Sequence, residues 1–171
     1  MNGGYICIMK IKTIMLVGTP IILLLAGCAS QPVVLAPVGP EQNNQVKYAS
    51  TGHLRVFSDT KTREIGENTF YYTHTRYVIQ DENGKIVKIV PNHIGDTDEM
   101  PTLVTIPSGN YKVVAQSSSY GRVTVPVFIQ AGQTTVVHLD RNWKSSKKLP
   151  TDELVYLPNG EAVGWRDSTI R

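Results

Sequence analysis

Residues 101–140 read PTLVTIPSGNYKVVAQSSSYGRVTVPVFIQAGQTTVVHLD, and this stretch indicates the fold class. Apolar and polar residues alternate in it with a period of two, and glycine or proline turns separate the runs, as is typical of β-strands. The pattern predicts a hairpin that turns at 107–109. It also predicts that strand 120–130 pairs with strand 134–140 across the turn at 131–133.

The alternation assigns side chains to faces. Three sets of side chains are expected, each on one face of its own strand: Tyr111, Val113 and Ala115; Thr135, Val137 and Leu139; and, further upstream, Leu54, Val56 and Ser58. Pro126 interrupts one of the predicted strands. Because proline has no N–H for a sheet ladder, that strand is expected to lie at an edge or to be bulged there.

Residues upstream of 101 continue the strand pattern. The run 70–92, FYYTHTRYVIQDENGKIVKIVPN, predicts a hairpin around Asp81-Glu82-Asn83-Gly84, since Asn-Gly favours the positive φ values of a tight reversal. No helical periodicity interrupts it. The sequence therefore predicts an all-β domain over 48–140, an antiparallel β-sandwich of about seven strands with an Ig-like or prealbumin-like arrangement.

One motif in this body has a known parallel. A hydrophobic strand, Pro-x-Gly-x-Tyr at 107–111, an alternating strand and a glycine turn into VVHLD together resemble carboxypeptidase-regulatory or PEGA-type sandwich modules over 101–140. The resemblance implies that Gly109 makes a turn and that Tyr111 enters the core. It also implies a non-catalytic spacer or binding platform.

The N-terminal region has the layout of a secretory signal. Lys10 and Lys12 precede an apolar run over 13–27. This run is shorter than the ~20 residues that a membrane-spanning helix needs, and small residues follow it, as at a signal cleavage site. Both Met1 and Met9 are candidate translation starts, and a start at Met9 would remove Cys7 from the chain.

Leu25-Ala26-Gly27-Cys28 resembles the lipobox of bacterial lipoproteins. The resemblance implies that residues 1–27 are removed and that the Cys28 thiol carries a diacylglyceryl group. Two or three acyl chains would anchor the protein stably, whereas one binds only marginally. Ala29 in place of Asp implies the outer membrane in a Gram-negative cell, and a Gram-positive cell would present the protein on its cell membrane. A core cysteine at the end of a buried helix is the alternative interpretation.

Two segments flank the predicted sandwich. The proline-containing stretch 28–47 is expected to be a flexible tether, with an edge strand at 32–37 as the alternative. At the other end, 141–171 begins with a basic cluster of Lys144, Lys147 and Lys148. This cluster is expected either to touch anionic lipid or cell-wall polymer, or to be a solvated linker. A hairpin over 153–166 follows and turns at 158–160. Because a lone hairpin is marginally stable, it is predicted to dock on the sandwich or on a partner.

Composition and motifs restrict the chemistry. The formal net charge of +3 and the lack of a basic stripe argue against a nucleic-acid partner. The histidines, His53, His74, His93 and His138, have no metal-ligand spacing, and no GxSxG or P-loop motif occurs. We therefore expect no metal, no cofactor and no catalytic residues. A hydrolase with a dispersed site is the least favoured alternative.

Two polar features have two interpretations each. His74 is expected to share a strand face with Tyr72 and Arg76, which is either a sugar- or anion-binding face or a plain exposed sheet face. The loop 92–99, with three acidic residues, is either a calcium site or a solvated loop. His138 is expected to face solvent.

The sequence thus predicts a membrane-anchored extracytoplasmic lipoprotein with a non-catalytic structural or binding module. Its partners would be membrane lipid, through acylated Cys28, and an envelope protein or a glycan. A cell-surface carbohydrate-binding module is the alternative, and it requires exposed aromatic side chains in one plane. The candidates for that set are Tyr71, Tyr72, Tyr77, Tyr120 and Trp165.

Overall fold

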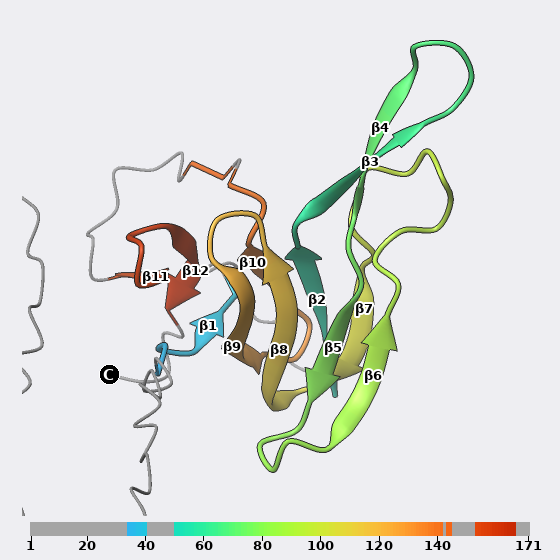
Figure 1. Cartoon of the computed structure of the whole chain (residues 1–171). Helices are drawn as coiled ribbons and strands as arrows, with labels where there is room; N and C mark the ends of the chain where they lie inside the picture. Colours follow the sequence, from blue (N-terminus) through green and yellow to red (C-terminus); the bar gives the residue numbers. More distant parts are fainter. Residues whose placement is uncertain (1–33, 41–49, 142, 145–152, 167–171) are drawn as a thin grey trace, which may run out of the picture. The chain divides into compact units, whose positions relative to one another are not determined.

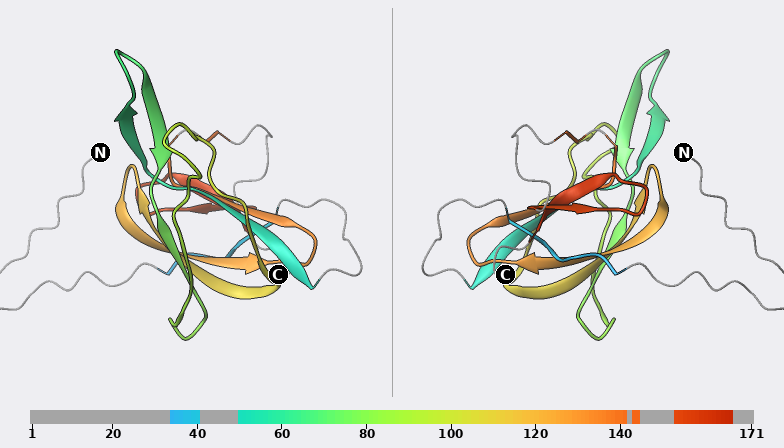
Figure 2. Two further views of the ribbon diagram at one scale, coloured as in Figure 1. Left: turned by 90° about the vertical axis from the view of Figure 1, so that its right-hand side faces the viewer. Right: turned by 90° about the vertical axis from the view of Figure 1, so that its left-hand side faces the viewer.

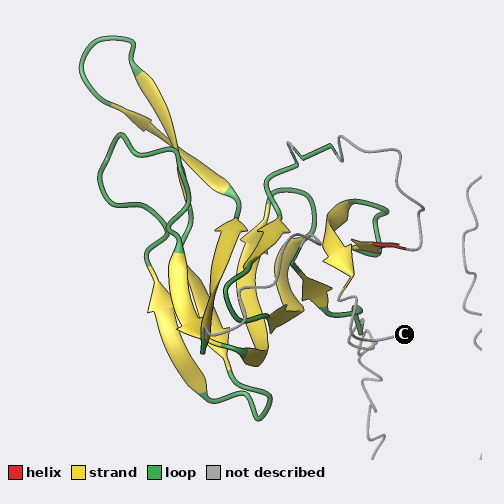
Figure 3. Cartoon of the chain, turned by 180° about the vertical axis from the view of Figure 1, so that it is seen from behind, coloured by secondary structure: helices red, strands yellow, loops and turns green. Residues whose placement is uncertain are grey.

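The computed structural model describes residues 34–40, 50–141, 143–144 and 153–166. The chain divides into two units, 1–32 and 33–171. The predicted signal peptide and Cys28 lie outside the described residues. Within the described ranges the protein is all-β (Figures 1 and 3), and none of their helical segments has the length and apolar content to span a bilayer.

The described residues form twelve strands. Their bounds are β1 (Val38–Gly39), β2 (Thr51–Phe57), β3 (Thr60–Glu64), β4 (Phe70–His74), β5 (Tyr77–Gln80), β6 (Ile86–Val90), β7 (Val104–Pro107), β8 (Gly109–Ser117), β9 (Gly121–Ile129), β10 (Thr134–His138), β11 (Leu154–Tyr156) and β12 (Ala162–Arg166).

These strands build a β-sandwich with an added ribbon. A seven-stranded sheet in the order β11-β12-β1-β9-β8-β5-β6 faces a three-stranded sheet in the order β10-β2-β7. β3 and β4 form a separate two-stranded ribbon that extends beyond both sheets (Figures 1 and 2). Pairing is antiparallel except between β1 and β9 and between β10 and β2, which are parallel.

The core lies between the two sheets and follows the predicted alternation. Leu54, Val56 and Ser58 on β2 and its C-terminal extension are buried, as are Thr135, Val137 and Leu139. On β8, Val113 and Ala115 are buried and Tyr111 packs against the cluster. Burying each Val, Leu or Ile side chain contributes about 1.5–3 kcal/mol, so this shared apolar layer holds the two sheets together.

Two of the predicted hairpins are wrong. The turn at 107–109 joins β7 in the small sheet to β8 in the large one, so these strands do not pair. Likewise β9 and β10, predicted to pair across 131–133, belong to different sheets. The alternation of side chains was sufficient to find the strands and their buried faces, but both connections cross from one sheet to the other.

Backbone hydrogen bonds explain why the second connection leaves the large sheet. Gly132 N donates to Thr51 O at 2.8 Å, and His53 N donates to Gln133 O at 2.7 Å. These bonds bring the start of β10 to the start of β2, and the two strands then pair in parallel from Thr134↔His53 onward. The short loop and the start of β10 are thus attached to the start of β2.

Two further predicted hairpins are confirmed, and one hairpin was not predicted. β5 pairs with β6 and β11 pairs with β12, as predicted. The longest hairpin joins β8 to β9 through 118–120, and the sequence pattern did not predict this pairing. Pro126 pairs in register with Lys112, with no bulge at that point, and the other side of β9 meets only the two-residue β1. β9 is therefore neither a true edge nor bulged at the proline.

The prediction of a tether over 28–47 is wrong for residues 34–40. β1 lies between β9 and β12 in the large sheet, and Val38 is fully buried. Leu35 also joins the core, and Pro40 bridges to Thr135. The apolar residues of this stretch fill space between the sheets, which offsets the cost of ordering a proline-containing segment. The C-terminal hairpin docks on the same strand through β12.

Candidate functional site

The β3–β4 ribbon presents an exposed aromatic face. The run 70–80, expected as one strand, splits at Thr75 and Arg76, so that β4 leaves the sandwich and pairs with β3. Phe70 and Tyr72 lie two residues apart and therefore on the same face of the ribbon. Their exposed fractions are 50% and 53%. About half of the surface of each residue is exposed, so both rings are available to a ligand.

Local turn chemistry explains the ribbon. Its tip runs through Gly66 and Asn68, whose φ values of 69° and 64° lie in the left-handed region that Gly and Asn adopt most readily. Ile65 N donates to Thr69 O at 2.9 Å and closes the turn. The register then places Tyr72 opposite Thr62 and Phe70 opposite Glu64, so polar side chains flank the two rings.

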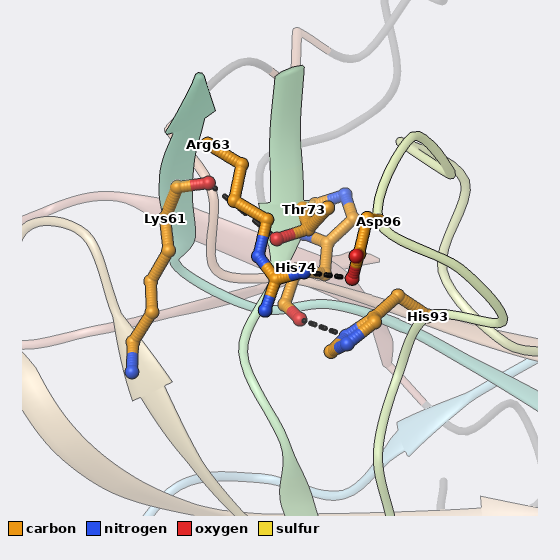
Figure 4. A network of polar contacts seen from close by, with 6 residues as sticks. All are labelled: Lys61, Arg63, Thr73, His74, His93 and Asp96. Atoms are coloured by element: carbon orange, nitrogen blue, oxygen red, sulfur yellow. Dashed lines mark hydrogen bonds and ion pairs between the residues drawn. The ribbon is translucent and has the colours of Figure 1, made fainter. Parts of the chain in front are cut away.

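The acidic loop after β6 braces this ribbon (Figure 4). Arg63 on β3 forms an ion pair with Asp96, and Tyr72 N donates to Glu99 Oε1 at 2.8 Å. Asp98 accepts hydrogen bonds from Ile94 N and Met100 N within the loop. Its three carboxylates therefore have separate partners: Asp96 and Glu99 hold the loop against the ribbon, and Asp98 stabilises the loop itself.

His74 lies at the base of the ribbon and is buried, so the expectation that it shares an exposed face with Tyr72 and Arg76 is wrong. Its Nδ1 lies 2.6 Å from Ser58 O, and its own carbonyl oxygen lies 3.3 Å from His93 Nδ1 (Figure 4). Since a carbonyl oxygen only accepts, Nδ1 carries the hydrogen in both rings. β4 ends at His74 because the chain there re-enters the sandwich.

Asn92 forms a buried polar junction beside His74. Its Nδ2 donates to Val56 O and to Ser58 Oγ, both at 2.9 Å, and to Thr75 O at 3.3 Å. Its Oδ1 accepts from Thr102 N at 3.2 Å. One side chain thus connects β2, the β4–β5 break and both ends of the bracing loop.

A column of aromatic rings runs from the ribbon base to the C-terminal hairpin. His138 stacks between Phe57, at 4.8 Å, and Trp143, at 4.5 Å between centroids. His74 and Trp165 meet the two ends edge-on. His138 is therefore partly buried, and the prediction that it faces solvent is wrong. Burial lowers the pKa of its imidazole to about 4.

The structure separates the aromatic residues predicted to form one planar set. Tyr77 is buried in the core, which raises the pKa of its hydroxyl. Trp165 belongs to the aromatic column, Tyr120 lies in the β8–β9 turn, and Tyr71 faces the side of the ribbon opposite Tyr72. Phe70 was missed, although its spacing of two residues from Tyr72 was sufficient to find it.

Other predicted site residues lie apart. The Nδ1 atom of His53 lies 3.1 Å from Thr105 Oγ1 on the small sheet. No hydrogen bond or ring contact given above joins His53 to the other histidines. Within the described ranges, no group of three or more His, Cys, Asp or Glu side chains is placed to hold a metal ion. Of the basic cluster, Lys144 is exposed, and Lys147 and Lys148 lie outside the described residues.

Comparison with known proteins found no match among family models, curated proteins or solved structures.

Proposed function

We propose that this protein is a lipid-anchored extracytoplasmic lipoprotein whose β-sandwich is a non-catalytic binding module. The observation that carries the proposal is the sequence Leu25-Ala26-Gly27-Cys28 directly after a short apolar run with upstream lysines. The Cys28 thiol would form the thioether to lipid, and the acyl chains would hold the protein at the cell membrane or the outer membrane.

The fold supports a short connection between lipid and body. Leu35 already belongs to the core, and seven chain steps separate it from Cys28. A fully extended chain spans at most ~3.6 Å per residue, so the sandwich would lie within about 25 Å of the lipidated residue. The binding module would then act close to the membrane surface.

The ionisable side chains near the ribbon support a non-catalytic role. His74 and His93 bond to carbonyl oxygens, and Asp98 holds backbone N–H groups of its own loop. Such contacts stabilise the ribbon and the loop beside it. The ribbon exposes Phe70 and Tyr72 to solvent, as a surface that recognises a ligand would do.

Lipidation is tested by mass spectrometry of the protein purified from membranes of its native host. The expected result is loss of residues 1–27 and added diacylglyceryl mass on Cys28. Cys28→Ser should leave an unmodified chain, whereas the control Cys7→Ser should retain the lipid. A native protein with a free Cys28 thiol or an intact leader would refute the proposal.

A second candidate function is glycan binding by the ribbon, and the pairing of Phe70 with Tyr72 favours it. The C–H faces of sugar rings stack on aromatic rings, and two rings on one strand face can contact successive sugars. On an array of cell-envelope glycans, we expect the wild type to bind and Phe70→Ala/Tyr72→Ala to lose at least tenfold in affinity, about 1.4 kcal/mol. Tyr120→Ala, which removes an exposed ring elsewhere, is the matched control. Equal binding by both variants would exclude the ribbon.

A further inference from the structure

The aromatic face of the β3–β4 ribbon has a carboxylate of its own. Directly paired residues of an antiparallel ribbon lie on the same side, with Cβ atoms ~4.5–5.5 Å apart. The register therefore places Glu64 beside Phe70 and Thr62 beside Tyr72. All four residues are exposed, so this face offers two rings, a hydroxyl and a carboxylate to a ligand.

The cations of the ribbon lie on its opposite face. Lys61 and Arg63 alternate with the residues of the aromatic face and therefore point to the other side. There Arg63 forms an ion pair with Asp96 of the bracing loop (Figure 4), and Thr73 is buried. Among the residues that the structure describes, Glu64 takes part in no ion pair. Its negative charge is therefore not neutralised by the ribbon's own cations.

A second carboxylate lies at the edge of the aromatic face. Tyr72 N donates to Glu99 Oε1 at 2.8 Å, which holds this carboxylate against β4. Over the ribbon (60–74) and the bracing loop (91–103), five acidic side chains compare with two basic ones. The field around the two rings is therefore negative, and it attracts cationic ligands and repels anionic ones.

We propose that the ribbon selects glycans that carry free ammonium groups, such as polymers of amino sugars without N-acetyl groups. The inference rests on glycan binding by the ribbon and names the class of glycan. A sugar ring stacked on Phe70 has its substituents beside Glu64, where an ammonium group donates charge-assisted hydrogen bonds to the carboxylate. An N-acetylated sugar offers only an uncharged amide there, and the carboxylates or phosphates of an anionic polymer are repelled.

Three tetrasaccharides test the selection by calorimetric titration of the full chain in detergent. They are the tetramers of glucosamine, which is cationic, of N-acetylglucosamine, which is neutral, and of galacturonic acid, which is anionic. At mildly acidic pH and low salt, the glucosamine tetramer should bind about two- to fivefold more tightly than the neutral one, because exposed ion pairs contribute little. Added salt should reduce this preference. Equal affinities for these two tetramers, or tighter binding of the anionic one, would overturn the selection.

Glu64→Gln tests the carboxylate without changing the size of the side chain. It should remove the preference for the glucosamine tetramer and leave the affinity for the neutral tetramer unchanged. Glu153→Gln is the matched control, because Glu153 is exposed directly before β11 and the change in net charge is the same. The control should keep the preference. A preference that persists in Glu64→Gln, or that both variants lose equally, would refute the role of Glu64.

The same titrations separate this inference from glycan binding itself. Binding of the neutral tetramer that is lost in Phe70→Ala/Tyr72→Ala, with no preference for charge, would keep the ribbon as a glycan site and refute only the selection. No binding of any tetramer would refute both. Tetralysine, which also carries ammonium groups but no sugar ring, should bind more weakly than the glucosamine tetramer. Equal binding through the same two rings would assign the surface to a cationic peptide and overturn the glycan as its ligand.

Discussion

Asn92 shows how much one polar side chain contributes to a fold whose described residues contain no cysteine. Its φ of 73° lies in the left-handed region, and its amide bonds four groups on three separate segments. Buried polar groups are costly when they lose a partner. The junction is therefore stable only while the side chain stays an amide of this length.

We expect Asn92→Ala to lower the free energy of unfolding by about 2–4 kcal/mol, because Val56 O, Ser58 Oγ and Thr102 N lose a buried partner. Asn68→Ala is the matched control. Asn68 has nearly the same backbone conformation, with φ 64°, but is exposed at the ribbon tip. Urea unfolding of both variants measures the difference. Equal losses would mean that backbone strain, and not hydrogen bonding, dominates at Asn92.

His138 gives the protein a pH-dependent stability. Burial between Phe57 and Trp143 lowers the pKa of its imidazole to about 4 from the ordinary 6.5. Above pH 6.5 both the folded and the unfolded state are neutral here, so stability does not change. Between pH 6.5 and 4 the unfolded state binds a proton that the folded state does not. Stability therefore falls as the pH falls through this window.

The expected loss is about 1–2 kcal/mol, less than the full shift implies, since the ring is partly accessible to water. His138→Phe keeps a ring between Phe57 and Trp143 but cannot titrate. The difference in unfolding free energy between wild type and variant, measured in urea from pH 7.5 to 4, isolates this group from the carboxylates and from His74. A difference that is independent of pH would refute the assignment.

At the scale of elements, the sequence identifies strands and buried faces better than strand partners. Alternation decides which side chains of β2, β8 and β10 are buried, because burial depends on local geometry with a period of two. Which strand a given strand pairs with depends on where the preceding loop forms its hydrogen bonds. Gly132 and Gln133 attach to β2, and nothing in the local pattern distinguishes this sheet crossing from a hairpin.

The candidate site was partly predictable for the same reason. The aromatic run on β4 is visible in the sequence, and its period assigns Phe70 and Tyr72 to one side. That the ribbon stands free of the sandwich depends on the break at Thr75 and on the bracing by Asp96 and Glu99. These are contacts across more than twenty residues of chain, and composition does not encode them.

The glycine at 164 makes a specific test of the C-terminal hairpin. A Cβ there would lie 2.6 Å from Val38 Cγ1 and 2.9 Å from Val136 O. β12 thus lies closer to β1, its neighbour in the large sheet, and to β10 of the small sheet than a Cβ at position 164 would allow. We expect Gly164→Ala to cost about 1–3 kcal/mol through overpacking.

Gly95→Ala is the control for Gly164→Ala, since a Cβ at Gly95 meets nothing within 4 Å. Thermal unfolding should show a lower midpoint for the first variant only. Val38→Ala should reduce the cost of Gly164→Ala, because the two positions are in contact and their effects are then not additive. Full additivity would contradict the proposed packing.

At the scale of the whole molecule, the folded body reaches further along the chain than the alternating core pattern of 48–140. Residues 34–40 and 153–166 complete one half of the large sheet, with β1 between β9 and β12. β12 depends on β1, because it pairs with β1 and without that strand would form only a marginal two-stranded hairpin. Residues 34–40, the described segment nearest the predicted lipid, are therefore part of the fold.

Two truncated chains test this dependence. A chain that begins at residue 33 keeps Leu35 and Val38 in the core and should unfold with the same midpoint as the mature protein. A chain that begins at residue 41 loses both side chains, each contributing about 1.5–3 kcal/mol, and also loses the strand that holds β12. Its midpoint in urea should fall sharply, and Trp165 fluorescence should report release of the hairpin. Equal midpoints for the two chains would instead assign residues 34–40 to the tether that their prolines predict, and the sandwich would then be free to stand further from the membrane.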